Sequence, residues 1–225
     1  MARRLLDVVL TGLALIVLAP AMALAAIGIR LSSPGPVLYR AVRAGRDGRP
    51  FVMYKMRTMH HRRRSDDSLI TAEDDSLITA EKDPRVFPFG AWLRRAKLDE
   101  LPQIFNVLRG EMAIVGPRPE DPTIVDQHYT AAQWETLKVA PGLTSPGALY
   151  STTHGEQRLS AVDPERDYVQ RVLPVKLALD RVYVRHASVG YDLALIFRTI
   201  AVVAGRALGR RLFRDPPEMR EALQL

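Results

Sequence analysis

Apolar residues dominate the start of the chain, where residues 5–29 carry a single charge, Asp7. The run is long enough for a helix that crosses a membrane, which takes roughly 20 apolar residues. Pro20 divides the run, because proline removes a helical hydrogen bond and kinks the helix axis. The two arms would reach about 18 Å and about 14 Å, so neither alone crosses a hydrocarbon core of about 30 Å.

Basic residues stand on both sides of this apolar run. Arg3 and Arg4 precede it, and a series of arginines follows it from Arg30 onward. Positive residues mark the cytoplasmic side of a membrane. A re-entrant hairpin places both flanks on that side, whereas a bent single span places one flank across the bilayer. We therefore expect a re-entrant membrane helix over residues 1–31 with its kink at Pro20, and we keep the bent span as the alternative.

Shorter patterns organise the rest of the chain. Residues 37–40 and 51–56 are typical of two strands joined as a hairpin through the Gly-rich turn at 45–50. We expect helices near residues 89–97, 104–108, 130–138, 164–184 and 191–210. The last of these carries few charges, so it suits either the membrane interface or a position against the core. These patterns divide the chain into residues 1–31, 32–205 and a basic C-terminal tail at 206–225.

A tandem duplication interrupts the polar stretch at residues 58–85, which we expect to be a loop. Residues 66–73 are repeated without change as residues 74–81. Two copies are too few for a solenoid, which needs at least three repeats. We interpret one copy as a unit inserted into a tolerant surface loop, with a pair of acidic ligand loops as the alternative.

Charge and composition narrow the possible partners. The 225 residues carry a net charge of +7, and residues 30–64 contain ten Arg or Lys against one acid, Asp47. A basic block directly after an apolar hairpin favours anionic membrane lipid and nucleotide phosphates as partners. No nucleic-acid-binding motif accompanies it, so we expect no nucleic acid. The absence of cysteine excludes disulfides and thiolate chemistry.

Two adjacent carboxylates, Asp99 and Glu100, stand just before Pro102, which is suited to open a helix. A helix start presents free N–H groups and a partial positive charge, so it favours phosphates and other anions. The segment therefore combines an anion-binding end with a potential nucleophile and a potential metal ligand. The simpler interpretation is that the two carboxylates only cap the helix.

Several ordered motifs together resemble the bacterial sugar transferases, the monotopic phosphoglycosyl transferases, over residues 3–205. Each motif is weak alone, but the set in this order is specific. The motifs are Arg4-Leu5-Leu6-Asp7, Ser33-Pro34-Gly35-Pro36-Val37, Arg43-Ala44-Gly45-Arg46-Asp47-Gly48, residues 51–59, Asp83-Pro84-Arg85-Val86, Leu98-Asp99-Glu100-Leu101-Pro102-Gln103 and Gly116-Pro117-Arg118-Pro119.

The resemblance implies an α+β protein: an N-terminal re-entrant membrane helix-hairpin, then a small, mainly helical cytosolic catalytic domain with a short β-hairpin and interfacial amphipathic helices. It implies transfer of a sugar 1-phosphate from a nucleotide diphosphate sugar, expected to be a UDP-sugar, to polyprenyl (undecaprenyl) phosphate, with release of a nucleoside monophosphate. It also implies a Mg²⁺ cofactor and a place on the cytoplasmic face of the bacterial inner membrane. A homo-oligomer is compatible with it. Residues 144–147 and the doubled loop at 66–81 depart from the family pattern.

The family's catalytic pair corresponds to Asp99 and Glu100. An aspartate can act as nucleophile and form an acyl phosphate, which gives Asp99 that role. Glu100 would hold Mg²⁺, which prefers oxygen ligands and bridges substrate phosphates. Phosphate-binding candidates are Arg118 between its two prolines, Arg85, Lys55, Arg57 and Gln103. For the basic residues the alternative is a solvated charge or a lipid contact.

A second class of function also fits part of the chain. A non-enzymatic, membrane-anchored basic scaffold that binds anionic lipid or a protein partner would explain the apolar hairpin and the basic block. It would not explain two carboxylates at a helix start beside arginines fixed by prolines. Release of a nucleoside monophosphate from a sugar nucleotide distinguishes the enzyme from the scaffold.

Overall fold

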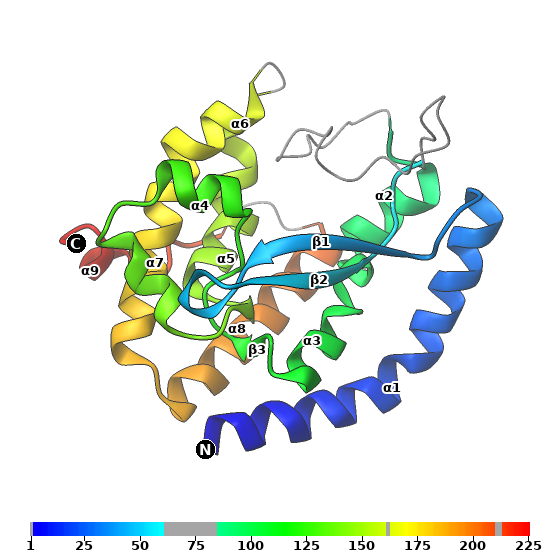
Figure 1. Ribbon diagram of the computed structural model, residues 1–225, viewed down its shortest axis with the longest axis horizontal. Helices are drawn as coiled ribbons and strands as arrows, with labels where there is room; N and C mark the ends of the chain where they lie inside the picture. The colour runs from blue at the N-terminus through cyan, green and yellow to red at the C-terminus, as the bar shows by residue number, and fades with distance from the viewer. Residues whose placement is uncertain (1, 61–84, 161–162, 210–212) are drawn as a thin grey trace.

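The computed structural model describes residues 2–60, 85–160, 163–209 and 213–225. Within these ranges the protein is mainly helical, with two small two-stranded sheets. A long helix, α1 (Ala2–Ser32), runs along one side of the molecule, and the remaining elements form a helical domain beside it (Figure 1). This mixture of helices with short strands confirms the α+β class. The duplicated segment lies outside the described residues.

Helix α1 stays continuous through Pro20 and bends along its length (Figure 1). Its two arms open away from each other and do not lie side by side as in a helical hairpin. Among the described residues it is the helix that is long and apolar enough to cross a membrane, and 11% of its apolar stretch is buried. Its exposed apolar side chains include Leu13, Ile16, Val17, Leu24 and Ile27.

The first turns of α1 are tied to the helical domain by polar contacts. The Arg3 guanidinium pairs with Asp192 at 2.6 Å. Arg4 donates to the carbonyl oxygens of Val107 and Leu108, and Asp7 accepts from the amide of Ile114 at 3.1 Å. Arg4 and Asp7 lie on one face of α1 because residues three apart in a helix are neighbours.

The last turns of α1 are attached by apolar packing instead. Ala25 and Ile29 are buried against Met56, Phe87 and Leu93 of the same domain. Both ends of α1 therefore contact one domain, while the stretch between them leaves its apolar side chains bare.

The predicted β-hairpin is confirmed, with a longer first strand. Strands β1 (Leu38–Ala44) and β2 (Pro50–Met56) pair antiparallel. Residues 46–48 turn the chain, with Asp47 and Gly48 at positive φ. The predicted first strand ended at residue 40, whereas β1 continues to Ala44. Ala41 and Ala44 are buried in this strand and belong to two different apolar clusters.

Most of the helices lie where the patterns placed them. They are α2 (Pro88–Arg95), α3 (Gln103–Arg109), α6 (Pro164–Asp167), α7 (Leu173–His186) and α8 (Val189–Ala207). Two further short helices, α4 (Pro122–His128) and α5 (Pro146–Tyr150), were not predicted. The expected helix at 130–138 is a 3-10 turn, Gln133–Lys138. The expected helix at 164–184 is divided into α6 and α7 by a π-type turn, Tyr168–Val172, followed by Pro174 inside the first turn of α7.

A second sheet was not predicted. Strands β3 (Ala113–Val115) and β4 (Gly142–Thr144) form a short parallel pair. Each strand has three residues, which is too short for an alternating pattern to be recognised in the sequence. This pair joins the two ends of the connection formed by residues 116–141. Residues 117–120 follow β3 and lead towards the candidate site.

Helices α7 and α8 supply much of the core of the domain. Leu177, Leu179 and Val182 of α7 are buried, as is Leu195 of α8. The other face of α8 exposes Phe197, Ile200 and Val203. The helix therefore combines the two expected possibilities, since one face packs on the core and the opposite face remains apolar and open.

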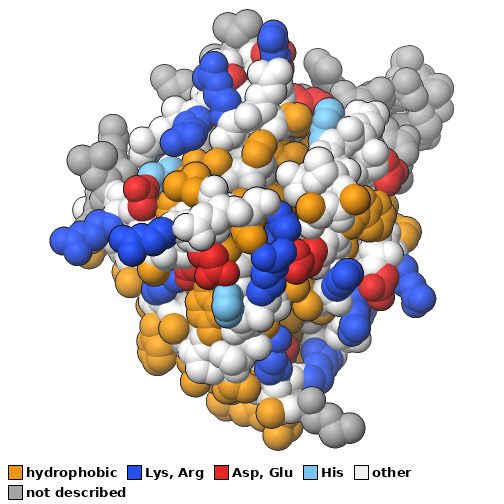
Figure 2. All heavy atoms as spheres, turned by 90° about the vertical axis from the view of Figure 1, so that its left-hand side faces the viewer, with side chains coloured by type: hydrophobic (Ala, Val, Ile, Leu, Met, Phe, Trp, Pro, Cys, Tyr) orange, Lys and Arg blue, Asp and Glu red, His pale blue; other side chains and the backbone are white. Residues whose placement is uncertain are grey.

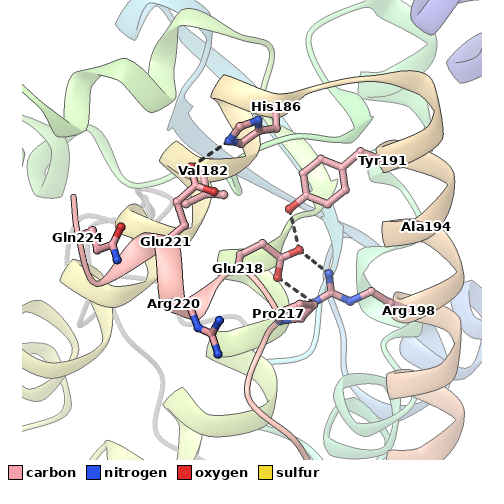
Figure 3. A pocket seen from close by; sticks show the side chains of 10 residues that line it. All are labelled: Val182, His186, Tyr191, Ala194, Arg198, Pro217, Glu218, Arg220, Glu221 and Gln224. Carbon is pink, nitrogen blue, oxygen red and sulfur yellow. Dashed lines mark hydrogen bonds and ion pairs between the residues drawn. The ribbon is translucent and has the colours of Figure 1, made fainter.

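The C-terminal segment at residues 213–225 docks on α7 and α8. Helix α9 (Met219–Ala222) contributes to an apolar cluster with Tyr150, Leu179 and Val182. Glu218 is buried, accepts from the Tyr191 hydroxyl and pairs with Arg198 (Figure 3). These residues border an open groove of about 790 Å³. Figure 2 shows basic, acidic and apolar side chains interspersed over this side of the molecule.

Candidate active site

A tight turn between α2 and α3 presents the two predicted carboxylates. Helix α2 ends at Arg95, Lys97 adopts a left-handed conformation with φ 57°, and Leu98–Glu100 form one 3-10 turn, η3. The start of α3 receives no side-chain cap. Asp99 and Glu100 are therefore not helix caps, which removes the simpler interpretation of this motif. The turn and α3 both pack against β2.

Asp99 is a buried carboxylate with open bonding capacity. Asp99 is 8% exposed, and its Oδ1 atom has no hydrogen-bond partner among the described residues. Burial raises the pKa of Asp99, and the Glu100 carboxylate raises it further. Lys55, Lys97 and Arg94 offset part of that rise. An unpartnered carboxylate oxygen in a site rich in cations is suited to attack the phosphorus atom of a bound phosphate group.

Glu100 differs from its neighbour because it is firmly ionised. Arg118 approaches it at 2.8 Å, and each of the two side chains is about a quarter exposed. Burial alone would raise the pKa of Glu100, but Arg118, Lys55 and Lys97 outweigh it and lower the pKa to about 2. Two adjacent carboxylates thus have different environments, which suits two different roles.

Lys55 of β2 joins the same cluster. Burial lowers the pKa of Lys55 to about 8, Glu100 and Asp99 oppose that fall, and Arg118 adds to it. The ammonium therefore remains mostly charged at neutral pH. Lys55 and Arg118 are far apart in the sequence, and together they place two positive charges beside the carboxylate pair.

Gln103 occupies the first turn of α3 and is fully buried. Neither its amide nitrogen nor its amide oxygen has a hydrogen-bond partner among the described residues. An unsatisfied buried polar group is costly, so an open amide donor and acceptor point to a bound group that completes them. Asn106, one turn later, is satisfied by Val52, Tyr54 and Glu111, which shows that α3 otherwise pairs its buried amides.

The structure places Arg57, another predicted phosphate-binding residue, away from the carboxylate pair. The Arg57 guanidinium donates to Ser33 and to the carbonyl oxygen of Pro36, at 2.6–2.9 Å, so it secures the loop after α1. Burial and nearby Arg30 lower its pKa. Arg85 lies at the edge of the undescribed segment, where its carbonyl oxygen accepts from the amide of His60. The contacts of Arg57 do not bring it to the carboxylate pair, and a phosphate-binding role for Arg85 stays a prediction.

Sequence reasoning missed two cations beside Asp99. Arg94 and Lys97 both lower the pKa of that carboxylate, and Arg94 also donates to the hydroxyl of Thr58 at 2.8 Å. Basic residues in the last turn of a helix are ordinarily explained by the helix dipole. Their position shortly before the acidic pair in the sequence is the signal that could have identified them as site residues.

The carboxylate pair also fits a magnesium ion. Among the described residues there is no group of three or more His, Cys, Asp or Glu that could hold a metal ion alone. Mg²⁺ is commonly bound by one or two carboxylates together with substrate phosphates and waters, so it needs no such cage. The ionised Glu100 oxygens, with Asp99 adjacent, are donors of that kind.

These features are typical of one class of protein, the membrane-associated enzymes that act on phosphate groups. The sequence profile of the bacterial sugar transferases matches residues 1–206. The chain therefore belongs to the bacterial sugar transferase family.

Three curated relatives carry the same description, UDP-glucose:undecaprenyl-phosphate glucose-1-phosphate transferase. The Escherichia coli K12 protein is 34% identical over 200 residues, which is 88% of this chain and 39% of the relative. The Caulobacter vibrioides protein is 36% identical over 201 residues, which is 88% of this chain and 68% of the relative. The Xanthomonas campestris protein is 38% identical over 213 residues, which is 91% of this chain and 39% of the relative. The chain thus spans about two fifths of two of these relatives.

Proposed function

We propose that this chain transfers a sugar 1-phosphate from a nucleotide diphosphate sugar to polyprenyl phosphate. UDP-glucose and undecaprenyl phosphate are the first candidate substrates, because the three relatives are named for them. The observation that carries the proposal is the pairing of an unpartnered buried Asp99 oxygen with an ionised Glu100 held by Arg118.

The first half-reaction uses Asp99 as nucleophile. A carboxylate oxygen of Asp99 attacks the β-phosphorus of the sugar nucleotide, and the bond from that phosphorus to the bridging oxygen of the α-phosphate breaks. The nucleoside monophosphate leaves with the bonding electron pair, and the sugar phosphate remains on Asp99 as an acyl phosphate. Lys55 and Arg118 offset the negative charge that builds up on the phosphoryl oxygens.

The second half-reaction restores the enzyme. A phosphate oxygen of polyprenyl phosphate attacks the same phosphorus, and the bond to the Asp99 oxygen breaks. The product is a polyprenyl diphosphate sugar, and Asp99 is again a carboxylate. Gln103 supports both steps, because its open amide N–H can donate to a phosphoryl oxygen that passes the site.

Glu100 is the proposed magnesium ligand, with Asp99 near enough in the chain to assist. When bound, the ion would neutralise phosphate charge and align the diphosphate. Removal of divalent metal with EDTA should then stop turnover, and added Mg²⁺ should restore it. Full activity in EDTA would exclude a metal requirement and leave charge neutralisation to Lys55, Arg118 and their neighbours.

We further propose that α1 enters and leaves the cytoplasmic leaflet of the inner membrane. Both of its ends contact the same domain, which supports a domain on one side of the bilayer. The bare apolar stretch between these ends and the exposed face of α8 would then rest in lipid, next to anionic headgroups.

Labelling of introduced cysteines tests this topology. The protein has no cysteine of its own, so a single one at Ala2 can be probed with a membrane-impermeant thiol reagent. We expect protection in intact cells and labelling after the inner membrane is opened. A control cysteine at Asp126, exposed on the domain, should behave in the same way. Periplasmic labelling at Ala2 together with protection at Asp126 would establish the bent single span instead.

The activity itself is tested with purified protein in detergent. With UDP-glucose, undecaprenyl phosphate and Mg²⁺, the enzyme should release UMP and form a lipid-linked glucose phosphate. Without the acceptor, UMP should appear only as a burst of up to one equivalent, since the phospho-sugar stays on the protein. A non-enzymatic scaffold would release no UMP from any member of a panel of sugar nucleotides.

A further inference from the structure

A second cluster of charges lies behind Arg118 and takes no part in the proposed chemistry. Lys176, on α7, is 2% exposed, and its ammonium contacts the carboxylate of Glu120. Tyr168 donates its hydroxyl to the same carboxylate at 2.5 Å. A buried charge is costly unless it is paired, so this pairing fixes Glu120 firmly to α7.

Glu120 ends a short segment, Pro117–Glu120, which we call the strap. The carbonyl oxygen of Pro117 accepts from the amide of Gly142 at 2.9 Å. The carbonyl oxygen of Glu120 accepts from the amide of Ala44, also at 2.9 Å. Arg118 lies between these two backbone attachments, and prolines on both sides restrict its backbone. The strap is thus held at each end, and the Glu120 side chain adds a third attachment.

We propose that Lys176 is a positioning residue: by holding Glu120 it fixes the strap so that the guanidinium of Arg118 reaches Glu100. Within the described part of the chain, the polar contacts of Lys176 are to Glu120 and Tyr168, and they include neither Asp99 nor Glu100. Its effect on the reaction therefore passes through Arg118. This inference rests on the proposed function, in which Arg118 binds substrate phosphate.

The charge of Lys176 is also balanced from a second side. Asp180 lies one turn further along α7 and accepts from the amide of Gly147 at 3.0 Å. Burial raises the pKa of Asp180 to about 6, and Lys176 opposes that rise. The ammonium that contacts Glu120 thus also favours the charged form of Asp180, which lies beneath the turn at residues 145–147. Removal of Lys176 takes the contact from Glu120 and the nearby positive charge from Asp180.

A double-mutant cycle tests the proposal. We expect Lys176→Met to lower kcat/KM for UMP release about tenfold to a hundredfold, the loss typical of a charged hydrogen bond. In an Arg118→Ala background, Lys176→Met should cause no further loss, because its effect passes through Arg118. Losses that multiply in the double variant would overturn the proposal, as would unchanged kcat/KM in Lys176→Met.

Two further variants separate positioning from general destabilisation. Arg181→Met removes a similar buried cation from the same helix, but one that pairs with Glu135 and not with the strap. It should leave kcat/KM near the wild-type value. If Lys176→Met does not fold, Lys176→Met/Glu120→Gln removes both charges of the pair and takes its place in the cycle, since it leaves no unpaired charge on the strap.

Hydrogen exchange supplies a measurement that does not depend on activity. In Lys176→Met, peptides that contain the amides of Ala44 and Gly142 should exchange faster than in the wild type, because the strap that accepts from them is loosened. Arg181→Met should leave both unchanged. Unchanged exchange at both amides in Lys176→Met would overturn the proposal. Absence of UMP release by the wild-type protein would reject the proposed function, and the exchange data would still decide whether Lys176 holds the strap.

Discussion

The strap separates two clusters of acids and cations that differ in one respect. Behind it, Glu120 is satisfied by Lys176 and Tyr168, while the neighbouring Asp180 keeps one buried oxygen without a hydrogen-bond partner among the described residues. In front of it, Asp99 and Gln103 keep polar atoms that have no partner among the described residues. Both clusters combine opposite charges. The difference between Glu120 and the pair Asp99 and Gln103 lies in the bonding capacity that remains for a ligand.

Open bonding capacity distinguishes a functional cluster from a structural one better than burial or charge does. A satisfied buried ion pair fixes a geometry, and its removal is destabilising because one charge is left behind. An unsatisfied buried group costs stability in the free protein, and it is retained where a ligand completes it. The contrast predicts that substitutions in front of the strap reduce turnover without unfolding the protein, whereas those behind it reduce stability and affect turnover only through the strap.

The largest effect is expected from Asp99→Asn. The change keeps the shape of the side chain but removes the nucleophilic charge, so turnover should fall about a thousandfold or more. Thermal stability should hold or rise, because a buried charge with an open oxygen is replaced by a neutral amide. UMP release and the melting temperature measure the two effects. Asp126→Asn, on an exposed carboxylate, is the control and should match the wild type.

An adduct experiment sharpens the same prediction. Enzyme mixed with labelled UDP-glucose, without acceptor, should carry a labelled phospho-sugar on the peptide that contains Asp99 after a rapid quench. Loss of turnover in Asp99→Asn with no adduct in the wild type would instead favour direct displacement, with Asp99 as a metal ligand or base. Acceptor-dependent turnover by Asp99→Asn would remove Asp99 as the required nucleophile.

The next effect concerns the residue at the border of the two clusters. Arg118→Lys keeps the positive charge but loses the planar fork that can bind two oxygens at once. We expect kcat/KM to fall by a factor that corresponds to a loss of about 1.5–3 kcal/mol of transition-state stabilisation, the range for a charged hydrogen bond. Arg198→Lys is a matched control, because Arg198 pairs through the same kind of fork with Glu218, outside the site. Wild-type kinetics in Arg118→Lys would assign Arg118 a structural role only.

How far the sequence predicts this arrangement depends on the separation of the residues involved. The apolar run, the β-hairpin and the carboxylate turn are encoded over short stretches, and each was predicted close to its observed position. The pairing of Glu120 with Lys176 joins residues far apart in sequence, and the parallel β3–β4 pair joins strands of three residues. Such contacts depend on the complete fold and leave no local pattern.

Lys55 and Arg57 show the same limit at the scale of one strand. They are two positions apart, and strand alternation would place them on one face. Strand β2 ends at Met56, however, and the chain then turns towards the loop after α1. Lys55 therefore faces the carboxylates, whereas Arg57 faces Ser33 and Pro36. Only the exact end of the strand separates the two roles.

A smaller effect is expected from the titration of Lys55. Because burial lowers its pKa to about 8, the ammonium is charged below that pH and loses its proton above it. Turnover should therefore fall as pH rises through about 8, where positive charge disappears from the site. Lys55→Arg retains its charge at higher pH, so its residual activity should lack this alkaline fall. The same fall in Lys55→Arg would show that another group titrates.

The smallest effect on turnover is expected behind the strap, from Tyr168→Phe. Burial and the nearby Glu120 raise the pKa of Tyr168 well above its usual range, so its hydroxyl stays protonated and donates to that carboxylate. Its loss should lower the unfolding free energy by about 1.5 kcal/mol, as expected for a hydrogen bond to a charged group. Turnover should stay within about threefold, because Lys176 still holds Glu120 and the strap keeps both of its backbone attachments. Tyr129→Phe is the matched control: Tyr129 lies near the same carboxylate, but no hydrogen bond from its hydroxyl is formed within the described residues, so its removal should cost less stability. A large loss of turnover in Tyr168→Phe at unchanged melting temperature would contradict the comparison, since it would place Tyr168 in the chemistry and make the rear cluster part of the active site.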